Sequence, residues 1–167
     1  MLINTKLAAI LLSLSLLSAC GFSLRGSSNA ELPLELQTLQ VLSQGGNNEL
    51  MRALQRSLKS SNITVIDDSQ AGIYRLTIGT EQVSERVISV NSTARAGEYE
   101  LSMSLSFQLD SDAESVLGPE ILSIERVYLA DPNNAVAKSD EGQLIRKEMR
   151  QALVRQILTR LQALSFE

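Results

Sequence analysis

The sequence has no histidine and no tryptophan, only one cysteine, Cys20, and only three prolines. Without imidazole there is no Ser-His or Cys-His nucleophile pair, and a single cysteine cannot complete a zinc site. Glycine-rich phosphate loops, the dinucleotide fingerprint and the G-x-S-x-G elbow are also missing. The composition therefore argues against the common classes of enzyme, and we expect no cofactor and no metal.

The charge pattern excludes further functions. The formal net charge is −4, and no basic run is long enough to indicate nucleic-acid binding. The paired carboxylates Asp67-Asp68 and Asp110 with Asp112 lie in segments with turn composition. We interpret them as turn residues rather than as an acid/base dyad.

The first 19 residues are typical of a secretory signal peptide. Lys6 precedes an apolar run from Leu7 to Leu17 that only Ser13 and Ser15 interrupt. A membrane-spanning helix needs about 20 apolar residues with anchoring flanks, and this run is shorter. We therefore expect residues 1–19 to be removed.

Cys20 stands where lipid would be attached. The segment Leu17-Ser18-Ala19-Cys20 resembles the lipobox of bacterial lipoproteins, in which the cysteine becomes the acylated first residue. The alternative is an ordinary buried thiol, but a lone cysteine has no intramolecular partner in an oxidising compartment. Several acyl chains would make the anchor effectively permanent. In the sorting rule that this signal resembles, Gly21 in place of Asp indicates the outer membrane.

The mature chain divides into a tether over residues 20–33 and a single domain over residues 34–167. A first strand is predicted for 34–42, a helix for 48–60 with apolar residues at helical spacing, and a β-branched strand for 63–66. A strand, a helix and a strand this close together predict two parallel strands.

The following segment alternates like strands of an antiparallel sheet. Tyr74 to Ile78 predicts a strand with a bulge or bend after Gly79, and Val87 to Val90 continues it. Tyr99 to Leu109 alternates strictly, so one face is buried and one is wet. An acidic loop is predicted for 110–120, followed by a strand over 121–129 that pairs with it as a hairpin.

The last segment predicts a helix over residues 139–164. Its apolar stripe consists of Leu144, Ile145, Met149, Ala152, Leu153, Ile157, Leu161 and Leu164. We therefore predict an α+β two-layer sandwich, with two helices on one face of a mixed sheet of about four strands. The open face should carry Ser, Gln and Glu, facing either water or the polar wall of a partner.

Several short motifs together resemble the LptE family of lipopolysaccharide-assembly lipoproteins. The similar segments are Cys20 to Gly26 (C-G-[FW]-x-L-R), Ala96 to Tyr99 before the long strand, Arg126, Asp131-Pro132, Ala137-Lys138 and Lys147 to Met149. Their order and spacing hold over the mature chain, which makes the set specific although each motif alone is weak.

The resemblance implies a non-enzymatic subunit that plugs the lumen of an LptD-type outer-membrane β-barrel and helps it to assemble. Barrel interiors are polar, and the three tyrosines and three phenylalanines of this chain suit a hydrophilic plug. The family also binds lipopolysaccharide, whose phosphates require cations. By motif, Lys138 is the first candidate contact, Arg95 the second and Arg126 the third. For each of them, a solvated or structurally paired cation is the competing interpretation, and for Arg126 the partners would be Glu98 or Glu125.

Two other functions remain open from the sequence. One is a periplasmic glycolipid carrier, which would need a deep apolar cavity. The other is an adaptor lipoprotein for another outer-membrane machine. We place the domain on the periplasmic side of the outer membrane or within the barrel lumen.

Overall fold

The computed structural model describes residues 32–46, 48–92, 94–112, 114–129 and 135–166, with side chains given for these except residues 48 and 135–138. The described residues belong to one compact unit, Glu31–Glu167. The predicted signal peptide, Cys20 and most of the predicted tether lie outside the described residues.

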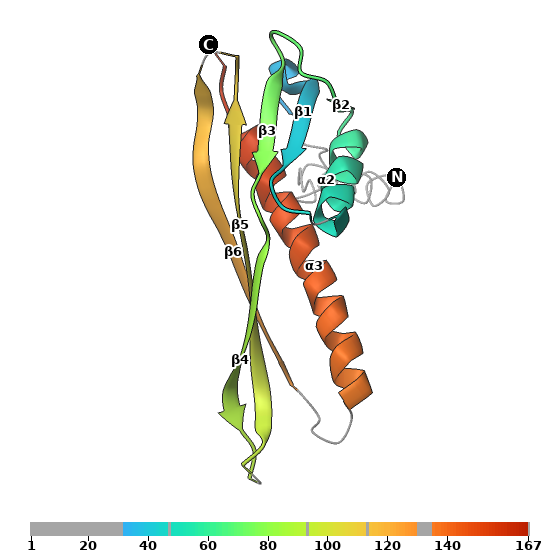
Figure 1. Cartoon of the computed structure of the whole chain (residues 1–167), viewed down its shortest axis with the longest axis vertical. Helices are drawn as coiled ribbons and strands as arrows, with labels where there is room; N and C mark the ends of the chain where they lie inside the picture. Colours follow the sequence, from blue (N-terminus) through green and yellow to red (C-terminus); the bar gives the residue numbers. More distant parts are fainter. Residues whose placement is uncertain (1–31, 47, 93, 113, 130–134, 167) are drawn as a thin grey trace, which may run out of the picture. The chain divides into compact units, whose positions relative to one another are not determined.

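Two helices pack on one face of a mixed sheet in this unit (Figure 1). The predicted α+β sandwich is confirmed, and the described part has six strands instead of about four. The strand order is β2-β1-β3-β5-β4, and β6 pairs with the other edge of β5. Neither helix of the described part has an apolar stretch that could span a membrane.

The first half of the sheet follows the predicted strand-helix-strand pattern. A short 3-10 helix η1 (Leu34–Leu36) precedes β1 (Thr38–Ser43), so the strand begins later than predicted. Helix α2 (Asn48–Ser60) leads to β2 (Thr64–Ile66), which is parallel to β1 as predicted. Strand β3 (Tyr74–Ile78) is also parallel to β1 and lies on its other side.

A bulge at Gly79 joins β3 to β4 (Gln82–Val90), and both strands pair with β5 (Ala96–Asp110). From Ile78 to Gln82 the chain advances four residues, while the partner strand advances three, from Phe107 to Ser104. The extra residue reverses which side chains face the helices. Leu76 and Ile78 are buried before the bulge, whereas Val83, Glu85 and Val87 of β4 face the helix side after it.

Strand β6 (Ser115–Leu129) forms an antiparallel hairpin with β5, as predicted, but it begins six residues before the predicted start at Ile121. The predicted loop over 110–120 is therefore wrong for its second half. Its Gly118-Pro119 pair suggested a loop, yet these residues lie at an irregularity in the pairing between Leu117 and Glu120. A bulge at a sheet edge tolerates proline.

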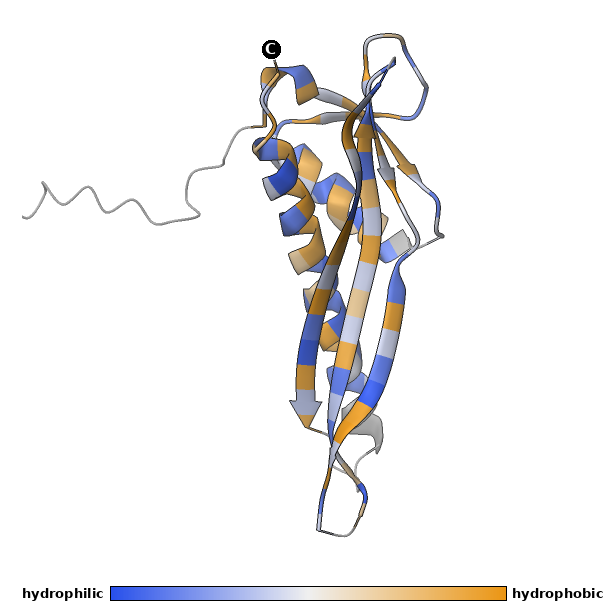
Figure 2. Ribbon diagram, turned by 90° about the vertical axis from the view of Figure 1, so that its left-hand side faces the viewer, coloured by the Kyte–Doolittle hydropathy of each residue, from blue (hydrophilic) through white to orange (hydrophobic). Residues whose placement is uncertain are grey.

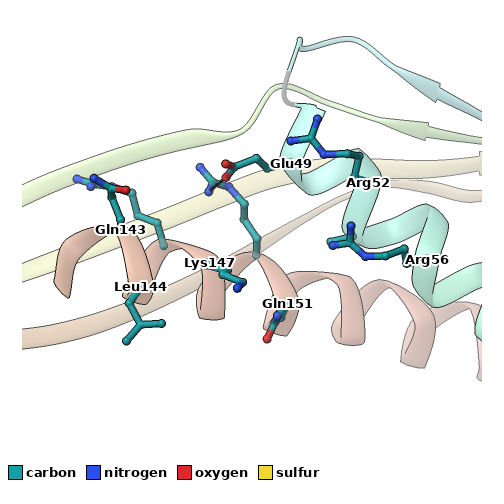
Figure 3. A pocket seen from close by; sticks show the side chains of 10 residues that line it. Glu49, Arg52, Arg56, Gln143, Leu144, Lys147 and Gln151 are labelled. Carbon is teal, nitrogen blue, oxygen red and sulfur yellow. Dashed lines mark hydrogen bonds and ion pairs between the residues drawn. The ribbon is translucent and has the colours of Figure 1, made fainter. Parts of the chain in front are cut away.

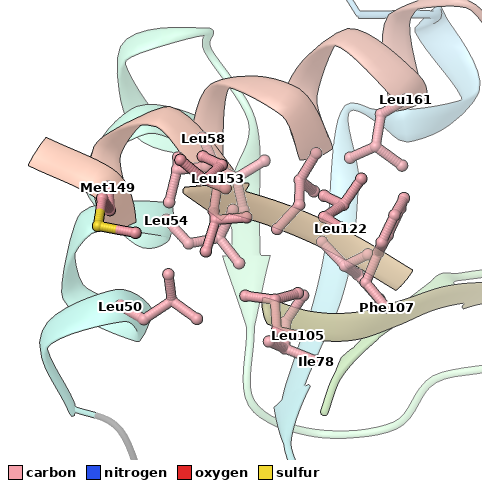
Figure 4. Packing of buried hydrophobic residues seen from close by; sticks show 14 of the residues in the cluster. Leu50, Leu54, Leu58, Ile78, Leu105, Phe107, Leu122, Met149, Leu153 and Leu161 are labelled. Atoms are coloured by element: carbon pink, nitrogen blue, oxygen red, sulfur yellow. The ribbon is translucent and has the colours of Figure 1, made fainter. Parts of the chain in front are cut away.

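Helix α3 (Ala135–Gln162) covers the sheet beside α2 and begins and ends earlier than the predicted helix over 139–164. Leu50, Leu54 and Leu58 of α2 meet the buried residues Met149, Leu153 and Leu161 of α3 over the sheet (Figure 4). Most of the predicted stripe is buried or half-buried, but Leu144 is 55% exposed. Val154, which was not predicted, is buried. Buried apolar side chains from both helices thus close one core over the sheet.

The open face of the sheet is less polar than predicted. Its central row on β5 consists of small serines, Ser102, Ser104 and Ser106, as expected. On β6, however, Ile121, Val127 and Leu129 point to the same side and are 77%, 54% and 69% exposed. Figure 2 shows the alternation of hydropathy along these strands. The prediction failed for β6 because its apolar residues occur on both faces.

Candidate functional site

The three cations expected to contact lipopolysaccharide come from elements that meet at one end of the domain. Arg95 follows the end of β4, directly before β5 begins at Ala96, and Arg126 lies near the end of β6. The register pairs Glu98 of β5 with Leu129 of β6, so both strand ends lie together. Lys138 is in the first turn of α3, which follows β6 along the chain. Its side chain lies outside the described residues.

Arg95 sits in a tight hairpin loop between β4 and β5. Its backbone N–H donates to Asn91 Oδ1 at 3.0 Å, and its carbonyl accepts from the Asn91 N–H at 2.7 Å. Ala94 beside it has a φ of 57°, a left-handed conformation that costs an L-residue about 1–2 kcal/mol. The backbone is thus fixed by hydrogen bonds, while the Arg95 side chain is exposed.

Arg126 lies opposite Leu101 and so points to the helix side of the sheet, where it remains exposed. Its Nη1 donates to the main-chain carbonyl of Glu125 at 3.1 Å. The carboxylate of Glu125 belongs to the opposite face by register. Arg126 therefore hydrogen-bonds to a main-chain carbonyl, and not to the carboxylate of Glu98 or Glu125 that the sequence suggested.

A second cationic region was missed in the sequence, because its residues come from two helices far apart in the chain. A groove of about 610 Å³ runs between α2 and α3 (Figure 3). It is lined by Glu49, Arg52, Ala53, Arg56, Gln143, Leu144, Arg146, Lys147, Arg150 and Gln151. The helical periodicity of both segments predicted that these side chains face outward, but not that the two outward faces adjoin.

Arg150 joins this groove to the sheet. Its guanidinium donates from Nη2 to Glu81 Oε1 at 2.9 Å and from Nε to Glu81 Oε2 at 3.0 Å, and from Nη1 to Glu49. The Arg150 side chain is 16% exposed and that of Glu81 only 4%. The hydrogen bonds to Glu81, and then the attraction of both carboxylates, raise the pKa of Arg150 against the opposing effect of burial. The cation is therefore permanently charged.

Other ion pairs fasten the lower part of the sheet. Arg146 Nη2 lies 3.2 Å from Glu85 Oε2, which links α3 to β4. On the open face, Arg86 Nε donates to Glu100 Oε1 at 2.6 Å, and this hydrogen bond lowers the pKa of Glu100. These pairs hold α3 and the strands in place. In the described part of the chain, no group of His, Cys, Asp and Glu could hold a metal ion.

Comparison with known proteins assigns this chain to a family. The sequence model described as "LptE: Lipopolysaccharide-assembly" matches residues 36–161, from η1 to the last turn of α3. The LPS-assembly lipoprotein LptE of Photorhabdus laumondii is 31% identical, with 92% of this chain and 86% of that protein aligned. The protein of the same name from Yersinia pestis is also 31% identical, over 92% of this chain and 76% of that protein.

Solved structures agree with the sequence comparisons. The crystal structure of rare lipoprotein B from Shewanella oneidensis has a TM-score of 0.67 at 30% identity, covering 74% of this chain and 92% of that one. The solution structure of lipoprotein B from Nitrosomonas europaea has a TM-score of 0.70 at 22% identity, covering 86% and 91%, and it supports the fold. The match over the whole described domain confirms the family predicted from the short motifs. The chain belongs to the LptE family of lipopolysaccharide-assembly lipoproteins, which act as assembly proteins and not as enzymes.

Proposed function

We propose that this protein is the lipid-anchored outer-membrane subunit of a lipopolysaccharide-export complex, in which it plugs an LptD-type β-barrel, assists the assembly of that barrel and binds lipopolysaccharide. The observation that carries the proposal is the family match over residues 36–161. Cys20 would carry the acyl chains, and Gly21 after it supports outer-membrane sorting. Residues 1–19 would be the signal peptide and 34–167 the working domain.

The sheet supports the role of a plug through the character of its open face. Small serines line β5, and three exposed apolar side chains, Ile121, Val127 and Leu129, lie beside them on the edge strand β6. Val127 and Leu129 are adjacent on this face, and Ser123 and Glu125 separate them from Ile121. Exposed apolar side chains beside polar ones suit a surface that meets a partner. We propose that this face lies against the barrel wall.

Lipopolysaccharide would be contacted at the end of the domain where Lys138, Arg95 and Arg126 are positioned. Two features support this assignment. The strands bring Arg95 and Arg126 to the same end as the start of α3, and Arg95 is exposed on a hydrogen-bonded loop. Guanidinium and ammonium groups are the donors that phosphates prefer.

The test of the complex is a mild-detergent pull-down of the lipidated protein from its own outer membrane, followed by mass spectrometry. A stoichiometric large barrel of the LPS-export type is expected. Recovery of a different barrel would favour an adaptor role for another machine, and recovery of none would contradict the proposal. Depletion of the protein should leave the barrel misfolded or degraded, whereas loss of an enzyme would leave a substrate to accumulate.

The test of the ligand site uses the full chain and purified lipopolysaccharide. Lys138→Gln combined with Arg95→Gln should weaken binding by at least about tenfold, since each charged contact contributes about 1.5–3 kcal/mol. Lys59→Gln, an exposed cation in the last turn of α2, is the control and should bind like the native chain. Equal binding by all three proteins would remove Lys138 and Arg95 from the site.

A further inference from the structure

The groove between α2 and α3 carries a concentrated positive charge on a chain whose net charge is −4. Five of its lining side chains are cationic and one, Glu49, is a carboxylate, so the formal surplus is four positive charges. Figure 3 shows Arg52 and Arg56 extending from α2, with Lys147 on α3 below them. The charge is therefore gathered locally against the overall balance of the protein.

The carboxylates nearby leave several of these cations uncompensated. Arg150 holds both Glu49 and Glu81, and Arg146 holds Glu85. Within the described residues, no carboxylate forms an ion pair with Arg52, Arg56 or Lys147. Arg52 and Arg56 are one helical turn apart, and like charges at this spacing destabilise a helix.

A solvated helix face would explain cations on a single helix, but it would not explain why cations from two helices line the same groove. Here a row from α2 and a row from α3 line the same concave surface, together with the amides of Gln143 and Gln151. A second hollow of about 480 Å³ continues along the helices and adds Arg155 to Arg56 and Gln151. Concavity, shared charge of one sign and neutral donors together are features of a binding site.

We propose that this groove binds the phosphate groups of a ligand that carries more than one phosphate, either a phosphorylated sugar in solution or a phosphorylated lipid headgroup. The planar forks of Arg52 and Arg56 suit bidentate hydrogen bonds to phosphate oxygens, and Lys147 adds a point charge from the other helix. Gln143 and Gln151 offer amides to hydroxyl groups. The inference rests on the groove alone and does not depend on the proposed role of Lys138, which lies about 13 Å away along α3 at 1.5 Å per residue.

The first measurement is protection of individual arginines from phenylglyoxal in the full chain, read by peptide mass spectrometry. One arm adds glucose 1,6-bisphosphate to detergent micelles that contain the protein, with glucose and the polycarboxylate tricarballylate as controls. The second arm compares mixed micelles containing cardiolipin, a lipid whose headgroup carries two phosphates, with micelles containing phosphatidylcholine. Protection of Arg52 and Arg56 by phosphate in either arm is expected, and the arm in which it occurs identifies the source. Absence of protection in both arms, or equal protection by tricarballylate, overturns the proposal.

Variants provide the second measurement on whichever phosphate compound protects. Arg52→Gln with Arg56→Gln should weaken its binding by at least about tenfold, and Lys59→Gln with Arg160→Gln, which removes the same charge outside the groove, should not. Lys138→Gln should leave phosphate binding at the groove unchanged while weakening the binding of lipopolysaccharide. The two proposed sites are therefore tested independently. Equal loss in both double variants would mean that net charge, and not the groove, attracts the ligand.

Discussion

Arg150 is the residue through which α3, α2 and the sheet are connected. It binds Glu81 between β3 and β4 with two parallel hydrogen bonds and reaches Glu49 in the first turn of α2. Taking such charges out of water costs several kcal/mol, and only complete hydrogen bonding offsets this cost. The intact pair therefore adds little net stability, but removing Arg150 would leave the buried Glu81 carboxylate without a cation and would be strongly destabilising.

We predict that Arg150→Gln destabilises the domain by about 3 kcal/mol, because it leaves the Glu81 carboxylate buried without its cation. Urea unfolding followed by circular dichroism measures the change. Arg146→Gln is the matched control, since Arg146 and Glu85 are 33% and 28% exposed and such pairs contribute less than about 1 kcal/mol. Similar losses in both variants would show that burial of the Glu81 pair is not what matters.

At this scale the sequence predicts residues through local motifs and misses those that act through distant contacts. Cys20, Arg95, Arg126 and Lys138 were identified from short patterns. The pairing of Arg150 with Glu81 was not, because 69 residues separate them and no periodicity relates a helix position to a bend in a strand. The groove cations were missed for the same reason.

Gly79 determines how the long strands present their two faces. Its amide donates to the Ser106 carbonyl at 2.7 Å, and a Cβ on Gly79 would lie 2.2 Å from Ser106 Oγ and 3.1 Å from that carbonyl oxygen. The bulge that this close approach permits turns Glu85 toward α3, where Arg146 binds it. One small residue therefore decides which side chains of β4 reach the helix.

We predict that Gly79→Ala destabilises the domain by about 1–3 kcal/mol, the usual cost of overpacking. Ser106→Ala should be nearly neutral alone and should recover part of the loss when combined with Gly79→Ala, because it removes the nearest atom. Thermal unfolding of the four proteins gives the coupling energy. Strictly additive changes would contradict a direct clash.

Element types followed from hydrophobic period, whereas element ends did not. Strand β5 was predicted because its apolar side chains alternate with a period of two over its length. Both helices were predicted because their apolar side chains repeat at helical spacing over several turns. The starts of β6 and α3 were placed too late because pairing across β5 extends β6 through Gly118-Pro119, and the first turn of α3 has no apolar stripe. A bulge or bend after Gly79 was predicted, but the reversal of the two faces that follows from it was not.

In the molecule as a whole, the two faces of the sheet have different roles. The helix face builds the core and, behind it, the cationic groove. The other face exposes serines of β5 and the apolar side chains Ile121, Val127 and Leu129 of β6. Parallel pairing of β1 with β2 followed from the short connection, but the insertion of β1 between β2 and β3 arises from long-range pairing, which no local pattern predicts.

Under the proposed function, Ile121→Lys combined with Val127→Lys should lower recovery of the barrel by at least about tenfold while changing the stability of the domain by no more than about 0.5 kcal/mol. Both side chains are exposed, so their loss removes partner contacts and not core packing. Quantitative pull-down measures recovery. Leu34→Lys, another exposed apolar residue outside the sheet, is the control, and equal loss there would contradict a specific role for the open face.

The hairpin of β4 and β5 extends past the start of α3 (Figure 1), and its last apolar residues on the helix side, Val83 and Val87, are 41% and 49% exposed. In mechanical terms the domain is a cantilever: it is clamped where two helices cover the sheet and becomes thinner toward its tip. A clamped beam deflects most at its end, so amide hydrogen exchange should be fastest there. Arg95 lies in the hydrogen-bonded loop at that tip, so under the proposed function the whole loop could move with the hairpin to meet a ligand without disturbing the core.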